Sequence, residues 1–228
     1  MNKCRRVAAV GARALAEAGW NVLQMDLLGC GDSDGDFGDA TWEAWLDDAV
    51  AACTWLASNV APASWLWGMR AGALLAVQCA ARLESQSNLL VWQPVLSGSQ
   101  HLTQFLRLKS AGEMLGGAEE RAGTQSLRDS LRAGATLEIA GYRLSAGLAD
   151  GLENAVFDLG SFQGRVVWCE VAAGDPPTLG PGARLKIEHW RESGRHIETI
   201  AVRGPNFWQS VEISECPQLV DATVGALS

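Results

Sequence analysis

Apolar runs of two different periods alternate along the chain. Short runs rich in β-favouring residues, such as 64–67 and 165–172, predict buried strands. Longer stretches carry apolar residues at three- and four-residue spacing, and the clearest of them, 41–57, predicts a helix that Asp39 or Thr41 caps. The predicted order is helix 4–18, strand 20–28, loop 29–39, helix 41–57, strand 64–67, helix 70–83, strand 88–94, strand 165–172, helix 182–193, strand 196–204 and helix 217–226.

The segment 98–160 interrupts this alternation. It is more polar and mostly helical in pattern, with a hairpin-like stretch at 135–145. Strands that alternate with helices predict an α/β fold, with a mostly parallel sheet and helices on both faces. We therefore expect a core formed by 1–97 and 161–228, and a helical lid insertion at 98–160.

Composition and charge exclude several classes of protein. The 228 residues carry a formal net charge of -8 and no Lys/Arg run, which argues against a nucleic-acid-binding protein. No uninterrupted apolar stretch is long enough for a transmembrane helix. Arg13 and Glu17 interrupt the N-terminal apolar stretch, which is typical of an amphipathic helix rather than a signal peptide. We expect a cytoplasmic protein with six scattered free thiols, because no C-x-x-C pair is present.

The stretch "LWGMRAGALLA", residues 66–76, has the frame of a nucleophile elbow. A short apolar strand ends at Gly68, Gly72 follows, and a helical pattern begins, as in G-x-S-x-G. The serine position is Arg70, which cannot act as a nucleophile because its guanidinium stays protonated and only donates hydrogen bonds. The alternative is a strand-to-helix turn in which the two glycines occur by chance.

Arg70 at a helix N-terminus suggests an anion-binding role. The free N–H groups there attract anions, so one hypothesis is a clamp for a carboxylate, phosphate or sulfate group, with Arg70, Ala71 and Trp92 as ligand-binding candidates. The alternative is a salt bridge between Arg70 and a neighbouring carboxylate. Trp67, Trp92 and Trp168 lie near strand ends, where they line either a pocket or the core.

The other members of a catalytic triad are incomplete. Asp175 follows a predicted strand at the position of a catalytic acid. The histidine is expected after the last strand, where the sequence has Phe207 and Trp208 instead. The three histidines of the chain (His101, His189 and His196) lie elsewhere, and without a base none of the candidate nucleophiles Ser33, Ser97 and Cys30 is easily activated.

Two further motifs in the acidic loop are poor matches. Asp32, Asp34, Asp36 and Glu43 have the spacing of a calcium-binding EF-hand loop, but Phe37 occupies the position that needs glycine. The glycines of "GCGDSDG" are wrongly spaced for dinucleotide binding. We therefore expect no metal and no cofactor.

Five stretches together resemble a known family. These are "MNKCRR", "DLLGCGDSDGDFGDATWEAWLDD", "LWGMRAGALLA", "WQPVLSGSQHLTQFLRLK" and "GPNFWQSVEI", which span nearly the whole chain. They resemble the second type of exosortase A system-associated hydrolase, in the α/β-hydrolase superfamily, found in exopolysaccharide-producing Gram-negative bacteria. The resemblance implies the α/β-hydrolase fold and a place in a locus for exopolysaccharide production and protein sorting. It implies nothing certain about activity, because a fold does not establish a reaction.

The chain departs from this family at its N-terminus, where members extend further through strands and a loop that contributes to the oxyanion hole. We expect an N-terminally truncated family member. Two classes of function remain: a degenerate hydrolase that binds a small anionic or acyl ligand, or an active hydrolase on an ester, thioester or other acyl bond with an unrecognised nucleophile.

Overall fold

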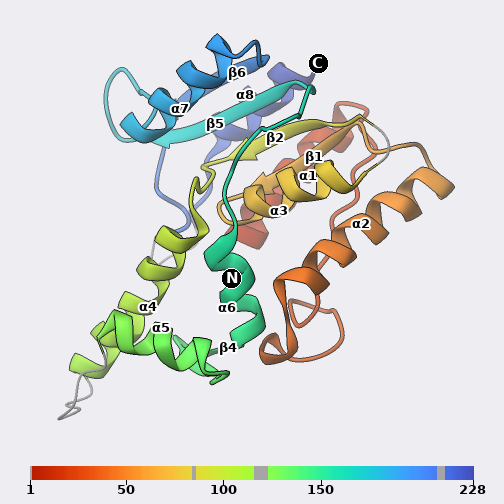
Figure 1. Cartoon of the computed structure of the whole chain (residues 1–228). Helices are drawn as coiled ribbons and strands as arrows, with labels where there is room; N and C mark the ends of the chain where they lie inside the picture. The colour runs from red at the N-terminus through yellow and green to blue at the C-terminus, as the bar shows by residue number, and fades with distance from the viewer. Residues whose placement is uncertain (1, 84–85, 116–122, 210–213) are drawn as a thin grey trace. The chain divides into compact units, whose positions relative to one another are not determined.

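The computed structural model describes residues 2–83, 86–115, 123–209 and 214–228, which form two compact units (Figure 1). The first, the sheet unit, consists of Met1–Gln24, Cys53–Pro94 and Leu159–Ser228. The second, the helical unit, consists of Met25–Ala52 and Val95–Asp158.

A four-stranded parallel sheet forms the centre of the sheet unit. Its strands are β1 (Trp65–Met69), β2 (Asn88–Trp92), β5 (Val166–Ala172) and β6 (Ile197–Arg203), in the order β1-β2-β5-β6. The two central strands are almost wholly buried, as expected for parallel strands covered on both faces. The predicted parallel sheet is confirmed, and the carboxyl ends of all four strands lie along one edge.

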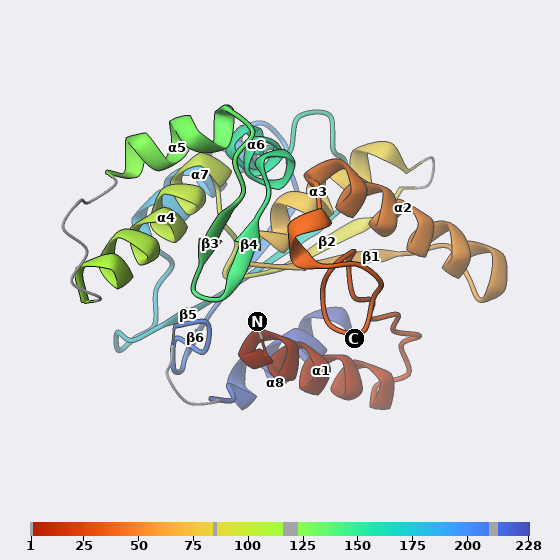
Figure 2. The ribbon, with the colours of Figure 1, turned by 90° about the horizontal axis from the view of Figure 1, so that it is seen from below.

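Helices cover both faces of this sheet. Figure 2 shows α1 (Asn2–Glu17) and α8 (Pro217–Leu227) on one face, and α3 (Gly72–Arg82) and α7 (Pro181–Glu192) on the other. α1 packs closely, because a Cβ at Gly11 would lie 2.7 Å from the Trp67 ring and 2.8 Å from the Trp92 ring. The predicted two-sided α/β arrangement is confirmed.

Trp92 belongs to the core of the sheet unit. It is fully buried, its ring contacts that of Trp67 edge to face at 4.5 Å, and its Nε1 donates to Thr223 Oγ1 at 2.9 Å. An indole buried and hydrogen-bonded in this way has no face left for a ligand. The prediction of Trp92 as a ligand-binding residue is therefore wrong, and core packing is the correct alternative.

The predicted strand at 20–28 is also wrong. Residues 21–24 are exposed and the whole stretch is irregular, while β1 pairs only with β2 among the described residues. The Leu28 N–H donates to the Asp48 carboxylate at 2.8 Å instead of to a strand. Residues with high strand propensity favour a strand because their side chains pack well on a half-buried sheet, and residues 21–24 are exposed instead.

The helical unit includes most of the segment 98–160, together with the acidic loop. Its elements are η1 (Phe37–Asp39), the first part of α2 (Trp42–Asn59), α4 (Gly98–Leu115), α5 (Thr124–Arg132), β3 (Leu137–Ile139), β4 (Tyr142–Leu144) and α6 (Ala146–Asn154). The predicted hairpin is the antiparallel β3–β4 pair. Thr41, rather than Asp39, caps α2, because its Oγ1 accepts from Ala44 N at 3.1 Å. No described helix of the chain is both long and apolar enough to cross a membrane.

Candidate functional site

The candidate site begins at the turn between β1 and α3. Arg70 occupies this turn with a φ of 54°, a left-handed conformation that side chains other than glycine rarely adopt. Its N–H donates to the Trp92 carbonyl at 3.0 Å, which fixes the turn to the end of β2. The strand, the turn and the helix follow in the order that a nucleophile elbow requires.

The two glycines around Arg70 have different roles. A Cβ at Gly68 would lie 2.5 Å from the Ala73 Cα, so only glycine lets α3 pack this closely against β1. A Cβ at Gly72 would meet nothing within 4 Å. Close packing therefore requires Gly68 but not Gly72.

The Arg70 guanidinium contacts two residues that follow other strands of the sheet, one after β2 and one after β6. Its Nη1 donates to the Gln93 carbonyl at 3.2 Å, and its Cζ lies 5.1 Å from the centre of the Trp208 ring. Phe207 is fully buried and holds Trp208 through an edge-to-face contact at 5.0 Å. The stretch after β6, where the sequence analysis expects a histidine and finds Phe207 and Trp208, thus supplies an aromatic face to Arg70.

Gln93 is a residue of this site that the sequence analysis missed. It has a φ of 43°, its N–H donates to the Cys169 carbonyl at 2.7 Å, and its Oε1 accepts from Val171 N at 2.8 Å. Strained non-glycine backbone at the ends of two neighbouring strands, at Arg70 and Gln93, is typical of functional sites. No local pattern distinguished it, because the strand predicted at 88–94 includes Gln93.

Glu170 is the second missed residue. It is a carboxylate in an apolar strand, only 7% exposed. One oxygen accepts from Trp168 Nε1 at 2.8 Å and the other from Gly180 N at 2.7 Å. Both oxygens are therefore engaged, and Glu170 does not pair directly with Arg70. The signal in the sequence was a single charge within "RVVWCEVA".

Arg70 has no direct carboxylate partner among the described residues. Burial lowers the pKa of the Arg70 guanidinium, while the nearby Cys4 thiol and Glu170 carboxylate act in the opposite direction. Arginine nevertheless stays protonated at neutral pH. Within the described ranges, no carboxylate forms an ion pair with Arg70. The alternative of a salt bridge that fills this position is therefore not found in that part of the chain.

The predicted acid lies on the surface. Asp175 follows β5 and pairs with Arg203 at 3.7 Å, but the two side chains are 82% and 70% exposed. A triad acid is normally buried against its histidine. Of the histidines, His101 lies in α4, His189 in α7 and His196 just before β6. Asp175 is placed for a surface ion pair and not for orienting a base.

The other candidate nucleophiles are held in structural contacts of the helical unit. Ser33 Oγ donates to the Asp26 carbonyl at 2.5 Å, and Ser97 Oγ accepts from Gln100 N at 3.3 Å. Burial and the carboxylates of Asp26 and Asp48 raise the pKa of the Cys30 thiol, which disfavours its thiolate.

The acidic loop forms no metal cage in the part of the chain that the structure describes. No group of three or more His, Cys, Asp or Glu side chains is arranged there to hold an ion. The backbone N–H groups of Asp32 and Asp36 instead bind the carboxylates of Asp26 and Asp39, at 3.1 and 2.9 Å.

Comparison with known proteins identifies the fold. No family model and no curated protein matches the chain. Similar solved structures include DcsB bound to a substrate analogue (TM-score 0.56, 15% identity, covering 95% of this chain and 83% of DcsB). A second is an α/β hydrolase from Sphaerobacter thermophilus (TM-score 0.51, 16% identity, covering 96% of this chain and 88% of that protein). A third is an esterase from Pyrococcus furiosus (TM-score 0.50, 16% identity, covering 93% of this chain and 70% of the esterase). The chain therefore has the α/β-hydrolase fold.

Proposed function

We propose that this protein is a non-catalytic α/β-hydrolase-fold protein that binds a small anionic group at Arg70. One observation carries the proposal. The turn that presents the nucleophile in hydrolases of this fold here presents a guanidinium, whose partners among the described residues are the Gln93 carbonyl oxygen and the face of Trp208.

The contact between Arg70 and Trp208 argues against triad catalysis. In hydrolases of this fold the nucleophile and its histidine meet where the elbow faces the loop after the last strand. Here the corresponding residues are Arg70 and Trp208, and they meet as a cation over an aromatic ring. Neither side chain can accept a proton, so the general-base step has no acceptor at this position.

The surroundings of Arg70 favour an anion. The N–H groups of Ala73 and Leu74 donate to the carbonyls of Arg70 and Ala71 at 3.1 and 3.0 Å, and the N-terminus of α3 carries the positive end of the helix dipole. The planar guanidinium still has donors beyond the one that binds Gln93, and it matches the two oxygens of a carboxylate, phosphate or sulfate group. Because Glu170 is already engaged by Trp168 and Gly180, an incoming anion does not compete with it.

Calorimetric titration with acetate, inorganic phosphate and sulfate tests the proposal. We expect at least one of them to bind the wild type, and Arg70→Ala to weaken that binding at least about tenfold, since a charge-assisted hydrogen bond is lost. Arg203→Ala is the matched control, because this arginine is exposed and already pairs with Asp175. Equal binding by wild type and Arg70→Ala would contradict the proposal.

A test for catalysis separates the alternative, an active hydrolase with an unrecognised nucleophile. The full chain is treated with a biotinylated fluorophosphonate and, separately, with short acyl esters. We expect neither labelling nor turnover above the background reaction. Labelling that maps to one serine, and disappears when that serine becomes alanine, would refute the non-catalytic assignment.

We also propose a role in an exosortase and exopolysaccharide system. The support is the resemblance of the five stretches quoted above, and the α/β-hydrolase fold agrees with it. Deletion of the gene in its own organism is expected to reduce exopolysaccharide export or the sorting of surface proteins. Complementation by wild type but not by Arg70→Ala would connect that role to the anion site, whereas an unchanged deletion strain would reject it.

The segment 98–160 is proposed to act as a lid. Its support is its position between β2 and β5, where it interrupts the strand–helix alternation. Hydrogen exchange measured with and without the bound anion tests this. Slower exchange in α4, α5 and α6 on binding is expected, and no change in those helices would argue against a lid.

A further inference from the structure

The two outermost strands of the sheet, β6 and β1, present very different free edges (Figure 1). β6 contains the charged residues Glu198 and Arg203, and its outer edge is partly covered. Arg191 of α7 donates to the Ile197 carbonyl through Nε at 3.1 Å and Nη2 at 2.7 Å, and to Thr199 Oγ1 at 3.2 Å. Charges and covered backbone groups are the usual means by which an edge strand avoids pairing with another chain.

β1 has neither of these features in the part of the chain that the structure describes. No charged residue occurs between Asp48 and Arg70, a stretch that contains the whole of β1. The strand is nevertheless accessible, because residues 65–67 and Met69 are partly exposed while residues 89–92 of the neighbouring β2 are buried. β1 is therefore an apolar, uncharged and accessible edge strand.

The backbone of β1 has free hydrogen-bonding groups along this edge. The Ser64 carbonyl accepts from β2 at 2.8 Å and the Arg70 N–H donates to β2 at 3.0 Å. Backbone groups alternate in direction along a strand, so the other even-numbered residues also face β2, while Trp65, Trp67 and Met69 face away from it. Among the described residues, none of these three makes a backbone hydrogen bond on that side.

We propose that the edge of β1 is an interaction surface for a second copy of this chain, on which two β1 strands pair antiparallel across a two-fold axis. The axis passes beside Trp67, so that Trp67 faces its own counterpart and Trp65 faces Met69 of the partner subunit. In this register every outward N–H of one strand meets an outward carbonyl of the other. The proposal does not depend on anion binding at Arg70.

Charge favours a second copy over a partner of a different kind. The chain has a formal net charge of -8, so two copies repel each other wherever their acidic surfaces meet. The edge of β1 is uncharged, and two copies approach there without placing like charges opposite each other. A basic partner, by contrast, would find no carboxylate on this strand.

The side chains of β1 support the same register. Trp67 packs against the Trp92 ring on the face that α1 covers, and the side chains of Trp65 and Met69 share that face because they lie two residues away on either side. Antiparallel pairing therefore places an indole opposite a thioether across the junction. Such cross-strand contacts between sulfur and an aromatic ring are favourable.

The association is expected to stop at a dimer. Pairing about a two-fold axis uses the same edge of both copies and leaves no second β1 edge free. The edge that remains on each copy is β6, which is charged and partly covered by Arg191. The two sheets would then form one continuous sheet that ends in a protected strand on both sides.

Sedimentation equilibrium of the full chain over a wide range of concentration tests the proposal. We expect a mass of twice 24.3 kDa at the upper end of the range. Met69→Pro removes an outward N–H but no hydrogen bond to β2, and it should raise the dimer dissociation constant at least about tenfold. Ala201→Pro is the matched control, because the N–H of this β6 residue also faces away from the sheet, and it should leave the dimer unchanged.

Hydrogen exchange of the wild type, resolved by residue with NMR, keeps the test independent of whether the variants fold. The amides of Trp65, Trp67 and Met69 should exchange at least about tenfold more slowly in the concentrated sample, where they are paired, than in the dilute one. The amides of Leu66 and Gly68 face β2, so dilution should not change their exchange.

Three results would overturn the proposal. The first is a wild type that stays monomeric at every concentration, which would leave the β1 edge to a strand of a different protein. The second is a dimer that Met69→Pro and Ala201→Pro weaken equally. The third is a dimer in which dilution does not alter exchange at Trp67, which would place the interface elsewhere on the chain.

Discussion

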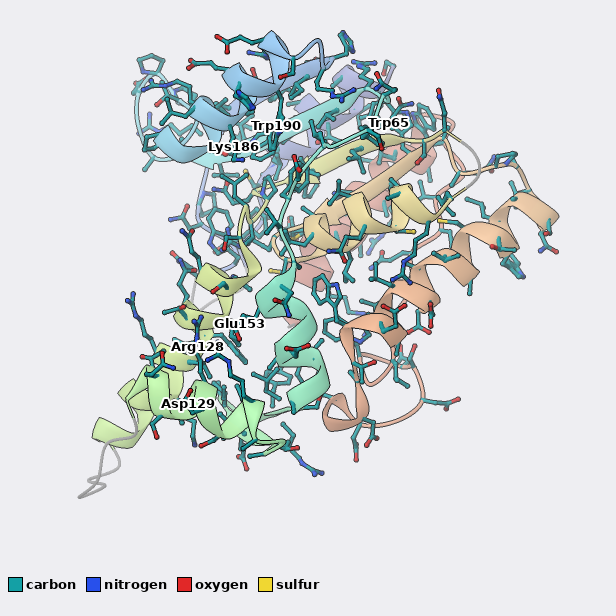
Figure 3. The ribbon with its side chains drawn as sticks, in the orientation of Figure 1. Trp65, Arg128, Asp129, Glu153, Lys186 and Trp190 are labelled. Carbon is teal, nitrogen blue, oxygen red and sulfur yellow. The ribbon has the colours of Figure 1, made fainter. Side chains whose placement is uncertain are left out.

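Arg70 in the sheet unit and Arg128 in the helical unit show two different uses of the same side chain. Arg128 contacts groups on two other helices: its Nη1 lies 3.1 Å from the Glu153 carboxylate of α6, and its Nη2 donates to Ser99 O at 2.7 Å and Thr103 Oγ1 at 2.6 Å in α4 (Figure 3). Among the described residues, the Arg70 guanidinium contacts the Gln93 carbonyl and the aromatic face of Trp208.

The two arginines differ in whether a buried carboxylate pairs with them. Arg128 and Glu153 are only 15% and 17% exposed, so each compensates the burial of the other. Near Arg70 the buried carboxylate, Glu170, is held by an indole and a backbone N–H instead. Arg128 thus links α4, α5 and α6 through its hydrogen bonds and ion pair. The Arg70 guanidinium, by contrast, binds a carbonyl and an aromatic ring instead of a carboxylate.

The largest expected effect comes from breaking the Arg128 cluster. Arg128→Ala should reduce the free energy of unfolding by about 2–4 kcal/mol, because it leaves the Glu153 carboxylate buried with less compensation. Arg132 also contacts Glu153, at 3.3 Å, but is 55% exposed, so Arg132→Ala should cost less than about 1 kcal/mol. Urea denaturation measures both, and equal losses would show that Arg128 has no special structural role.

An intermediate effect is expected at the glycines that shape the Arg70 turn. Gly68→Ala should destabilise by about 2 kcal/mol, because the new Cβ meets the backbone of Ala73. Gly72→Ala adds its Cβ in open space and should change the free energy of unfolding by less than about 0.5 kcal/mol. Thermal or urea unfolding of the pair tests whether backbone packing holds Arg70 in place, and similar losses for both would contradict this.

The smallest effect is expected at Arg70 itself. Its contacts are few, so Arg70→Ala should change the free energy of unfolding by less than about 1 kcal/mol. Arg70→Gly should be more stable than Arg70→Ala by about 1 kcal/mol, because glycine adopts a positive φ without strain. Paired denaturation curves measure the difference, and a loss from Arg70→Ala as large as that from Arg128→Ala would remove the contrast between the two arginines.

Much of the fold follows from local patterns in the sequence. The strands at β1, β2, β5 and β6 and the helices between them were predictable, because apolar periodicity and glycine placement act over a few residues. The glycine spacing also predicted a sharp strand-to-helix turn at Arg70, and the structure shows that turn. The prediction of a strand at 20–28 was wrong because it rested on composition alone. The composition of this stretch favours a strand, but a strand also needs a pairing partner, which composition does not specify.

The partners of Arg70 could not be predicted in this way. The contacts with Gln93 and Trp208 join distant parts of the chain, and the sequence holds no local signal for which side chain faces the guanidinium. The same is true of Glu170, whose hydrogen bonds to Trp168 and Gly180 occupy the two oxygens that would otherwise be available to Arg70. Burial and hydrogen-bond satisfaction are properties of the assembled core, so these choices appear only in three dimensions.

The stacking of Arg70 on Trp208 gives the site an optical reporter. Indole emission responds to a cation above its ring, so an anion that draws the guanidinium away changes the fluorescence of Trp208. Trp92 and Trp168, by contrast, are fully buried and contribute a steady background. Subtracting the emission spectrum of Trp208→Phe from that of the wild type isolates the signal, so occupancy of the site can be followed by light without any attached dye.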